Sequence, residues 1–454
     1  MVKRLTAVFV LSFFVGLIFT GGAFAAAKRS DVKWTRHISE DWNVDGSGYE
    51  SLQVPQRAYS KYSGSGAKLT CADIAPEVGT IIQHDQIGDT WYDFQKNASM
   101  GRMISVTSSG YRHLSWMYTD HAYPPGPRGV DANCKDPSGT YIGQVHADYG
   151  DMNSGYSNQT HLHNGTSVII HHRTATTPTW WSTLTLDDDL CGGFFTKHWD
   201  LPDNIVGNTS GQLGSWPKAE VLYNSEDGID YIHIVMTEGN TAGGVASMLA
   251  YERCYISPTN ADTLYCQCYV NGAPATYAMN VNQNGLGNFG YVGYFDSSCS
   301  VSPVVAVSPV SKRVAVAYLK PADVAGTCDY IEDACWIESM NNGNDWVDGT
   351  GWPPTVHNLT NFGLTGTERC FHDVSLCYDY DDSLHIAYLT TGFDPANPGF
   401  YQPGIARIYH WSKKSGAGMI HSNLQGTGGD AGSHNAYLCK MSISAKDPIY
   451  HPGG

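Results

Sequence analysis

The chain is poor in charged residues, and positive charge is scarcest. Lys and Arg number 27 against 43 Asp and Glu, so the formal net charge of the 454 residues is −16, and charged residues make up only 15%. Proteins that bind nucleic acid usually present a basic surface that neutralises phosphates. The charge balance therefore argues against a nucleic-acid partner.

Long apolar runs are missing except near the N-terminus. There, residues 5–20 are mostly apolar, they follow Lys3 and Arg4, and residues 23–25 (Ala-Phe-Ala) match a cleavage site. This arrangement predicts a secretory signal peptide at residues 1–27, because the apolar run is too short for a membrane anchor. We expect a secreted or cell-surface protein with no transmembrane segment after signal cleavage.

Several motifs of catalysis are also lacking. The sequence has no Gly-x-Ser-x-Gly elbow, no His-Glu-x-x-His pair and no phosphate-binding loop. No catalytic residue can be assigned from these patterns. An enzyme is therefore the less favoured interpretation.

The chain is not short of cysteine, but it has no C-x-x-C pair. Its 12 Cys form an even number, which allows disulfides in an exported chain. Candidate groups are the close pairs 328/335 and 370/377, and a cluster of Cys254, Cys266 and Cys268 on a predicted hairpin. The spacing leaves the connectivity open, and a zinc site is the alternative for the cluster.

A strand–turn–strand pattern recurs along the chain, which contains 49 Gly, 28 Tyr and few helix-forming runs. The complete copies cover residues 103–120, 160–173, 219–239, 303–323 and 374–392, and a sixth begins at 439–448. Their second strands start roughly 54 to 82 residues apart. A period of this length exceeds a hairpin and fits one four-stranded propeller blade with its loops.

We therefore expect an all-β fold, a β-propeller of four-stranded antiparallel blades, with six blades favoured and seven as the alternative. The propeller is predicted at residues 77–454, after an N-terminal extension at 28–76. The repeated pairs should be inner strands, apolar on both faces. Outer strands are predicted at residues 248–256, 335–340 and 405–414.

We expect the two ends of the propeller domain to meet in one blade and so close the ring. Residues 88–95 read as an outer strand that precedes the first repeat, and the sixth repeat lacks outer strands of its own. The N-terminal strand would then complete the C-terminal blade and remove the open sheet edges. The final residues read as a turn, so we expect the protein to continue beyond residue 454.

One motif carries a family resemblance. Residues 339–346 read Ser-Met-Asn-Asn-Gly-Asn-Asp-Trp, which resembles the Asp-box S-x-D-x-G-x-x-W with Asn341 in place of Asp. Asp-boxes lie on the turn between outer strands in sialidase-superfamily (BNR-type) propellers. The resemblance implies that Ser339, Asn341, Gly343 and Trp346 have this structural role and that the mature chain is similar to a secreted sialidase-like propeller.

The catalytic residues of sialidases do not transfer by the same resemblance. That family uses an arginine triad, with one Arg in an Arg-Ile-Pro setting, together with an Asp acid and a Tyr/Glu nucleophile pair. The sequence has no Arg-Ile-Pro. Arg102, just before a predicted inner strand, is the nearest counterpart, and the other groups match no position.

Residues 41–46 (Asp-Trp-Asn-Val-Asp-Gly) resemble the start of a calcium loop. Asp41, Asn43 and Asp45 would supply alternating oxygen ligands before a glycine turn, which suits Ca²⁺. The twelfth position is Leu52 rather than Glu, which excludes an EF-hand. A looser calcium site and an ordinary Asx-rich turn are the two alternatives.

Histidines form a second candidate group. His161 and His163 lie two apart on a predicted strand, so they would share a face, as two metal ligands would. No nearby carboxylate completes such a site, which favours ordinary polar strand residues. His113, His233 and His385 recur at comparable positions in their repeats, and this recurrence indicates a structural role.

Taken together, the sequence favours a secreted or cell-surface propeller that acts as a binding, adhesion or structural scaffold. Its ligand would be an extracellular carbohydrate or protein held at one mouth of the ring. The alternative is a sialidase-like glycoside hydrolase. The sequence assigns no cofactor, and the calcium ion is its main candidate beside the zinc alternative for the cysteine cluster.

Overall fold

The computed structural model describes the chain in segments, namely residues 85–90, 99, 101–120, 128–148, 153–174, 180–207, 214–238, 247–270, 272–282, 291–299, 301–321, 332–346, 353–362, 366–393, 401–423 and 441–444. The chain divides into residues 1–82 and residues 83–454, and only the second unit contains described residues. The predicted signal peptide, the extension at 28–76 and the calcium candidates Asp41, Asn43 and Asp45 therefore lie outside the described residues.

All regular structure in the described residues is β-strand, and these residues contain no helix that could cross a membrane. Sheet I holds β1 (Ile104–Val106), β2 (Arg112–Tyr118), β3 (Gly129–Lys135) and β4 (Val145–Asp148). Sheet II holds β5 (Asn153–His161), β6 (Ser167–Thr174), β7 (Trp181–Leu186) and β8 (Lys197–Asp200).

Sheet III is the largest, with β10 (Gly214–Asn224), β11 (Ile229–Glu238), β12 (Ser247–Ile256), β13 (Thr263–Val270), β14 (Ala273–Asn280) and β16 (Tyr294–Ser298), which pairs with β12. Sheet IV holds β17 (Val304–Val307), β18 (Val314–Pro321), β19 (Glu332–Ser339) and β20 (His357–Asn358). Sheet V holds β21 (Glu368–Tyr378), β22 (Leu384–Phe393), β23 (Tyr401–Ser412) and β24 (Gly416–Asn423). A short parallel pair joins β9 (Asn204–Ile205) to β15 (Tyr291–Val292).

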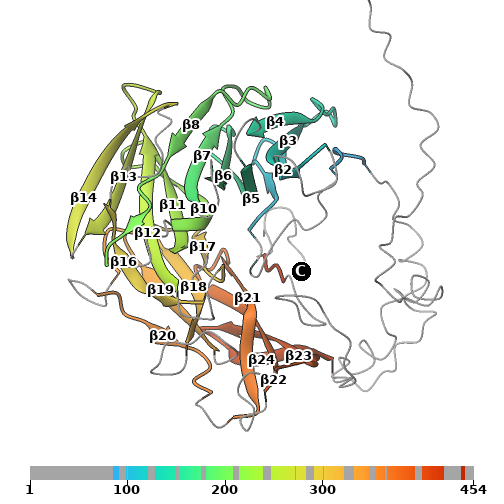
Figure 1. Cartoon of the computed structure of the whole chain (residues 1–454), viewed down its shortest axis with the longest axis vertical. Coiled ribbons are helices and arrows are strands. Elements are labelled where there is room, and N and C mark those ends of the chain that lie inside the picture. The colour runs from blue at the N-terminus through green and yellow to red at the C-terminus, as the bar shows by residue number, and fades with distance from the viewer. Residues whose placement is uncertain are drawn as a thin grey trace, which may run out of the picture. The chain divides into compact units, whose positions relative to one another are not determined.

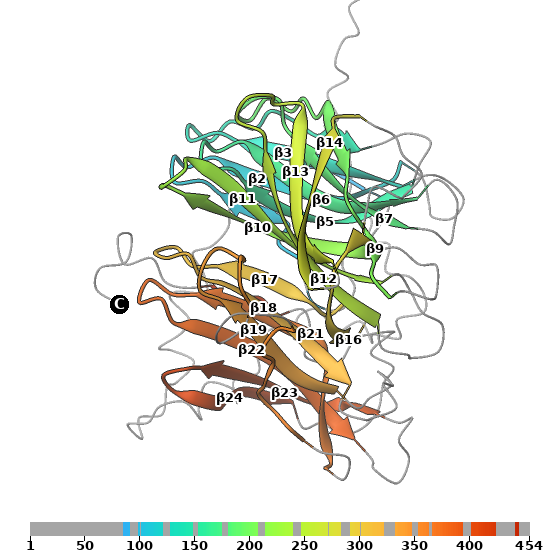
Figure 2. The ribbon, with the colours of Figure 1, turned by 90° about the vertical axis from the view of Figure 1, so that its left-hand side faces the viewer.

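The five sheets are antiparallel, and each packs on the next in chain order (Figure 1). The first strand of each sheet makes much of this contact: β5 packs on sheet I, β10 on sheet II, β17 on sheet III and β21 on sheet IV. In Figure 2 the strands of sheets IV and V run in successive layers. This arrangement is propeller-like, with the first strands innermost.

Strand β18 shows why the repeated segments are apolar throughout. Val314, Val316 and Tyr318 face the cluster shared with sheet III, whereas the alternate residues Ala315 and Leu319 face the cluster shared with sheet V. Successive side chains of a strand point to opposite faces, and here both faces are covered. Each fully buried Val or Leu contributes about 1.5–3 kcal/mol, so the strand cannot alternate between apolar and polar residues.

The predicted inner and outer strands agree with this arrangement. The repeated pairs are the first and second strands of the five sheets, and the segments predicted as outer strands belong to the third strands β12, β19 and β23. The described residues form five such sheets. Of the sixth predicted repeat, at residues 439–448, the structure describes only residues 441–444, and these form no strand. Six blades and ring closure therefore stay predictions.

The predicted outer strand at 88–95 is not seen in its described part, because residues 88–90 form no strand. Side chains of sheet I hold this segment instead: the Trp116 indole donates to the Asp89 carbonyl at 3.4 Å, and Asn133 Nδ2 donates to the Ile87 carbonyl at 2.5 Å. Hydrogen bonds from side chains impose no strand register, which explains why an alternating pattern failed to predict the structure here.

Two disulfides occur among the described cysteines. Cys134 of β3 bonds Cys191, which follows β7, and so ties sheet I to sheet II. Cys254 of β12 bonds Cys266 of β13 within sheet III. The candidate pair 370/377 is wrong: both residues lie in β21 and are unbonded. Since a strand rises about 3.3 Å per residue, their Cα atoms are roughly 20 Å apart, beyond the reach of a disulfide.

Candidate functional site

A cavity of about 860 Å³ brings together the first strands of all five sheets. Its walls come from segments far apart in sequence, at residues 101–106, 158 and 161, 218–220, 304–307 and 309, 375–378 and 380, and 442–444. We call this cavity the channel. It is the feature of the described structure that collects side chains from every sheet at one place, and it is therefore the candidate ligand site.

One ion pair crosses the channel wall between β1 and β10. Arg102 Nη1 lies 2.6 Å from Glu220 Oε2, with side chains that are 49% and 12% exposed respectively. Burial raises the pKa of Glu220, and Arg102 opposes that rise. Glu220 therefore needs its partner to stay ionised, whereas Arg102 still offers half its surface to a ligand.

Lys218 is the second cation in the wall, but its ammonium group already has partners. Its Nζ donates to the carbonyls of Val301 and Pro303, both at 2.8 Å, and the side chain is buried. These bonds tie β10 to the segment that leads into β17. Lys218 therefore acts as a structural link between sheets III and IV.

His161 is the channel's imidazole. It hydrogen-bonds the Ser105 hydroxyl, and burial, reinforced by His113 and Arg102, lowers its pKa to about 4. A neutral imidazole next to a hydroxyl can donate and accept hydrogen bonds at physiological pH. It offers a ligand polar contacts without adding charge.

The expectation that His161 and His163 share a face is wrong. His161 is the last residue of β5, and the turn that follows redirects the chain. The His163 ring stacks on Tyr223 at 3.9 Å, and its backbone N–H donates to Asp230 at 2.9 Å. The pair therefore cannot hold one metal ion.

An aromatic cluster lies near the starts of β5 and β10. The Arg128 guanidinium sits 5.4 Å from the ring centre of Tyr156 and 5.0 Å from that of Trp180, with the His172 ring 4.3 Å from Trp180. Tyr156 and Trp216 have φ values of 52° and 49°, and both fall where the strand register shifts. Such bulges redirect side chains. Sequence reasoning missed this cluster because a bulge depends on strand pairing.

The channel does not reproduce the sialidase site. Arg102 is the only arginine among the described residues that line it, and none of those residues is an Asp. A tyrosine–glutamate pair is present, since the Tyr378 hydroxyl donates to Glu338 at 2.8 Å. However, burial raises the pKa of Tyr378 well above its usual value, whereas a nucleophile needs activation.

Tyrosine–carboxylate pairs also recur elsewhere. The Tyr318 hydroxyl donates to Asp296, and the Tyr409 hydroxyl donates to Glu368 at 3.1 Å. Similar tyrosine–carboxylate pairs therefore occur in several sheets. A single active site would need only one of them. The Tyr378–Glu338 pair is therefore a structural contact between sheets.

The Asp-box-like residues form the turn between β19 and β20. The Ser339 hydroxyl accepts the Gly343 N–H at 2.9 Å, and Asn341 Oδ1 accepts the Asp345 N–H at 2.9 Å. The Trp346 indole donates to the Gly343 carbonyl at 3.1 Å. Gly343 has a φ of 72°, and a Cβ there would collide with the Tyr251 hydroxyl, so only glycine fits.

This turn fastens sheet IV to sheet III. Trp346 is buried against Tyr251 and Phe295, with ring centres 4.5 Å and 4.9 Å away. His233 of β11 bridges the two sheets: its Nδ1 accepts from the Tyr251 hydroxyl at 2.7 Å, and its Nε2 donates to Asn342 Oδ1 at 3.0 Å. The contacts are structural, and they leave the channel untouched.

The buried imidazole of His233 predicts a pH-dependent stability. Burial, and secondarily Arg253, lowers its pKa to about 3, against about 6.5 in an unfolded chain. The unfolded state then binds a proton that the folded state does not, so stability falls as the pH drops from 6.5 toward 3. This residue should contribute about 1.4 kcal/mol per pH unit in that window.

Urea denaturation at several pH values between about 7 and about 5 tests this prediction. A His233→Gln variant should show a shallower loss of unfolding free energy than the parent protein. His421→Gln, on the partly exposed β24, serves as the control and should keep the parent's slope. Equal slopes for the parent and His233→Gln would show that His233 does not carry the effect.

No family model matches the chain, and no curated protein sequence matches it. Several solved structures are similar at low identity. "Hadza microbial sialidase Hz136" is 12% identical over 64% of this chain and 64% of its own, with a TM-score of 0.27. "Bacteroides ovatus Xyloglucan PUL GH43B" is 13% identical over 78% and 60%, with a TM-score of 0.32. "Inulosucrase from Halalkalicoccus jeotgali bound to kestose" is 10% identical over 76% and 94%, with a TM-score of 0.36. Values this low assign the chain to no family.

Proposed function

We propose that the chain is an exported, propeller-like binding protein whose channel holds an extracellular carbohydrate. The observation that carries the proposal is the channel wall itself. Arg102, whose side chain is 49% exposed, lines the channel together with Asn158 and His161 and with Ile104 and Val106, which are 56% and 57% exposed. Sugars present both hydroxyl groups and apolar C–H faces, so a mixed wall of this kind suits them.

Binding is favoured over sialidase-type hydrolysis by the composition of the described wall. A single arginine, paired with Glu220, replaces the expected triad. The one tyrosine–glutamate pair near the channel is held as a sheet contact, with the tyrosine pKa raised. The wall can orient a sugar, and its tyrosine–glutamate pair is not an activated nucleophile.

The proposal also includes three features that were predicted from the sequence. We propose export through the signal peptide at 1–27, an Asp-box relationship for Ser339, Asn341, Gly343 and Trp346, and a sixth blade that closes the ring. The two disulfides are compatible with an oxidising compartment. A calcium ion held by Asp41, Asn43 and Asp45 is the accompanying metal proposal.

Glycan-array screening followed by calorimetric titration of the best binder tests the function. We expect Arg102→Ala to weaken binding about tenfold or more, the value of one charge-assisted hydrogen bond. Arg112→Ala, an exposed arginine at the start of β2, is the matched control and should bind as the parent does. Because Glu220 loses its partner in Arg102→Ala, Arg102→Lys is included to keep the charge.

Two outcomes would count against this proposal. One is an absence of glycan binding across the array, and the other is equal affinity for Arg102→Ala and Arg112→Ala. Turnover of fluorogenic sialosides or xylosides that is lost in Arg102→Ala would instead support the hydrolase alternative.

A further inference from the structure

Four side chains that can bind a metal ion share one face of sheet III. Glu252 and Cys254 lie two apart on β12, and Cys266 and Cys268 lie two apart on β13. The register pairs Cys254 with Cys266 and Arg253 with Gln267, which places Glu252 opposite Cys268. Residues two apart on a strand point the same way, so the four residues mark the corners of a square.

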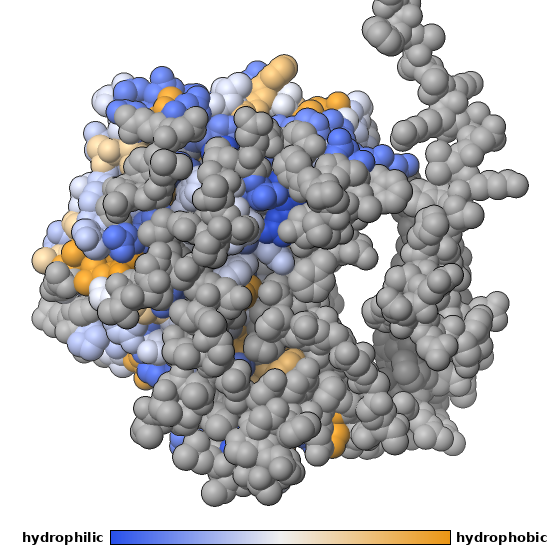
Figure 3. All heavy atoms as spheres, viewed as in Figure 1, coloured by the Kyte–Doolittle hydropathy of each residue, from blue (hydrophilic) through white to orange (hydrophobic). Residues whose placement is uncertain are grey.

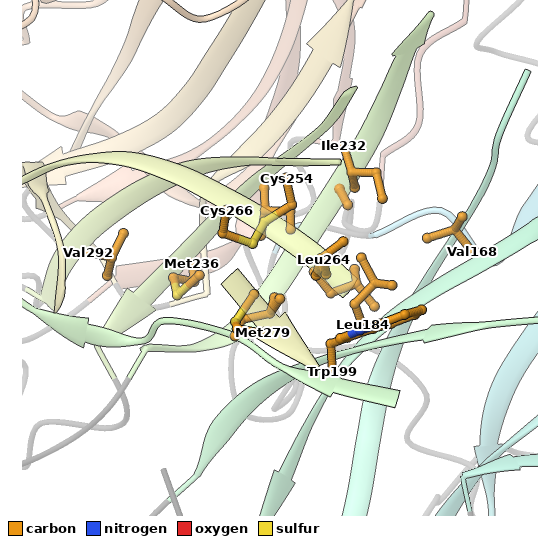
Figure 4. Close-up of a cluster of buried hydrophobic side chains, with 14 of the residues drawn as sticks. Val168, Leu184, Trp199, Ile232, Met236, Cys254, Leu264, Cys266, Met279 and Val292 are labelled. Carbon is orange, nitrogen blue, oxygen red and sulfur yellow. A yellow bond between two sulfur atoms is a disulfide. The ribbon is translucent and has the colours of Figure 1, made fainter. Parts of the chain in front are cut away.

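We call these four residues the thiol–carboxylate square. The ligand atoms of Glu252, Cys254 and Cys266 lie within 4.8 Å of one another. All four side chains are buried in the apolar cluster between sheets II and III. Figure 4 shows Cys254 and Cys266, joined as a disulfide, among Ile232, Leu264 and Met279.

Glu252 is the residue that the fold alone does not explain. Both of its carboxyl oxygens are buried and have no hydrogen-bond partner within the described residues. Burying a polar group without a partner costs roughly 2–7 kcal/mol. A cross-strand disulfide needs no carboxylate beside it, and an aliphatic side chain would pack better there.

Among the described residues, no Lys, Arg or His side chain pairs with Glu252. The nearest arginine in sequence, Arg253, points to the other face, where it bonds Gln267 Oε1 and the Asn342 carbonyl. Asp203 is a second buried carboxylate, and it raises the pKa of Glu252 further. Cys268 donates only a weak hydrogen bond, to the Tyr291 carbonyl at 3.3 Å. The group best suited to this place is a cation.

We propose that the thiol–carboxylate square binds one zinc ion when the Cys254–Cys266 disulfide is reduced. Cys254, Cys266 and Glu252 supply three ligand atoms that lie within 4.8 Å of one another. Cys268 lies outside that group and would complete a tetrahedral set by turning its thiol away from the Tyr291 carbonyl. Thiolates select zinc over calcium or magnesium. The disulfide form described above is then the oxidised, metal-free state of the same site. This inference concerns a site remote from the channel and does not rest on the proposed function.

The chemistry of the switch balances with a dithiol as the reductant. The dithiol gives two electrons and two protons to the Cys254–Cys266 bond and becomes a disulfide, which leaves two protein thiols. Zinc then replaces the protons of Cys254, Cys266 and Cys268 and of the protonated Glu252 carboxyl. Burial raises the pKa of Cys268 to about 12, and coordination to the metal overcomes this cost.

The sequence alone argued against zinc because the chain has no C-x-x-C pair and because Cys266 and Cys268 were expected on opposite faces of their strand. The second reason is wrong, since residues two apart on a strand share a face. Strand pairing supplies the missing proximity: Cys254 and Cys266 are 12 residues apart in sequence, but their Cα atoms are 4.1 Å apart. The carboxylate could not be recognised as a fourth ligand without the register.

Cobalt(II) titration of the full chain tests the proposal, with a phosphine as the reductant because dithiols compete for metals. The reduced protein should bind one equivalent of Co²⁺ with thiolate-to-cobalt charge transfer and the visible absorption of tetrahedral cobalt. Zinc should displace it. The unreduced protein should show neither signal. Glu252→Gln and Cys268→Ser should each weaken Zn²⁺ binding at least about tenfold, whereas the control Cys335→Ser, another buried free thiol, should not.

Alkylation with iodoacetamide, read by peptide mass spectrometry, keeps the test independent of whether the variants fold. All five thiols are buried, so the reduced parent protein is labelled in urea just below its unfolding midpoint. There, zinc should slow the labelling of Cys254, Cys266 and Cys268 more than that of Cys335 and Cys377. Equal labelling of all five cysteines with and without zinc would overturn the proposal. Octahedral cobalt without thiolate charge transfer would overturn it as well.

Discussion

Replacing Trp346 by alanine should lower the free energy of unfolding by about 3–5 kcal/mol, the usual cost of removing a buried aromatic side chain. Trp346 is fully buried, and it closes the turn after β19 through its hydrogen bond to Gly343. Its ring also packs on Tyr251 and Phe295 of sheet III. The substitution therefore leaves a cavity where two sheets join.

Urea denaturation followed by circular dichroism measures this loss. Phe194→Ala is the control, because the Phe194 side chain is 64% exposed and its removal should change stability by about 0.5 kcal/mol or less. If Trp346→Ala cost no more than Phe194→Ala, the turn after β19 would not be the fastening between sheets III and IV that we describe.

Removal of the Cys134–Cys191 disulfide should cost about 4 kcal/mol by the chain-entropy estimate for a bridge that closes a loop of this length. The two residues are 57 positions apart and connect sheet I to sheet II. Without the bond the unfolded chain gains freedom, and the contact between the first two sheets loses its covalent link. The expected change is a large fraction of the roughly 5–15 kcal/mol by which a typical domain is stable.

The double variant Cys134→Ala/Cys191→Ala, compared with the parent under oxidising conditions, measures this effect. Its unfolding midpoint in guanidinium chloride should fall, and adding reductant should then change it less than it changes the parent's. An unchanged midpoint would mean that the bond is absent or contributes no constraint.

The strands could be predicted from sequence because their evidence is local. In residues 303–323, two apolar runs flank a polar turn, and the structure forms β17 and β18 there. Both faces of β18 are buried, so its residues are apolar throughout. In the sequence this appears as an apolar run without alternating polar residues. The all-β class and the order of the strand pairs follow from the same signal.

The channel could not be predicted in the same way. Arg102 and Glu220 belong to different repeats, and nothing in either segment indicates the other. Their proximity depends on how sheets I and III are placed around the cavity. Glu252 could not be recognised as a metal-ligand candidate from the sequence either. It lies beside the cysteines only because β12 pairs with β13.

The errors also have a physical basis. His161 and His163 span the end of a strand, where the period of two no longer applies. Cys370 and Cys377 are close in sequence but extended along one strand. In each case the expectation assumed a backbone geometry that the surrounding sheet overrides.

The central claim is the proposal that the channel, which is lined by the first strands of five sheets, is where the ligand binds. The space-filling view in Figure 3 shows described atoms that are mostly hydrophilic, with small apolar patches among them. Hydrogen–deuterium exchange with and without the bound glycan tests the claim most directly. We predict that the ligand slows exchange together in residues 101–106, 158–161, 218–220, 304–309 and 375–380. Slowed exchange confined to one sheet, or to the fourth strands β4, β8, β20 and β24, would contradict the account.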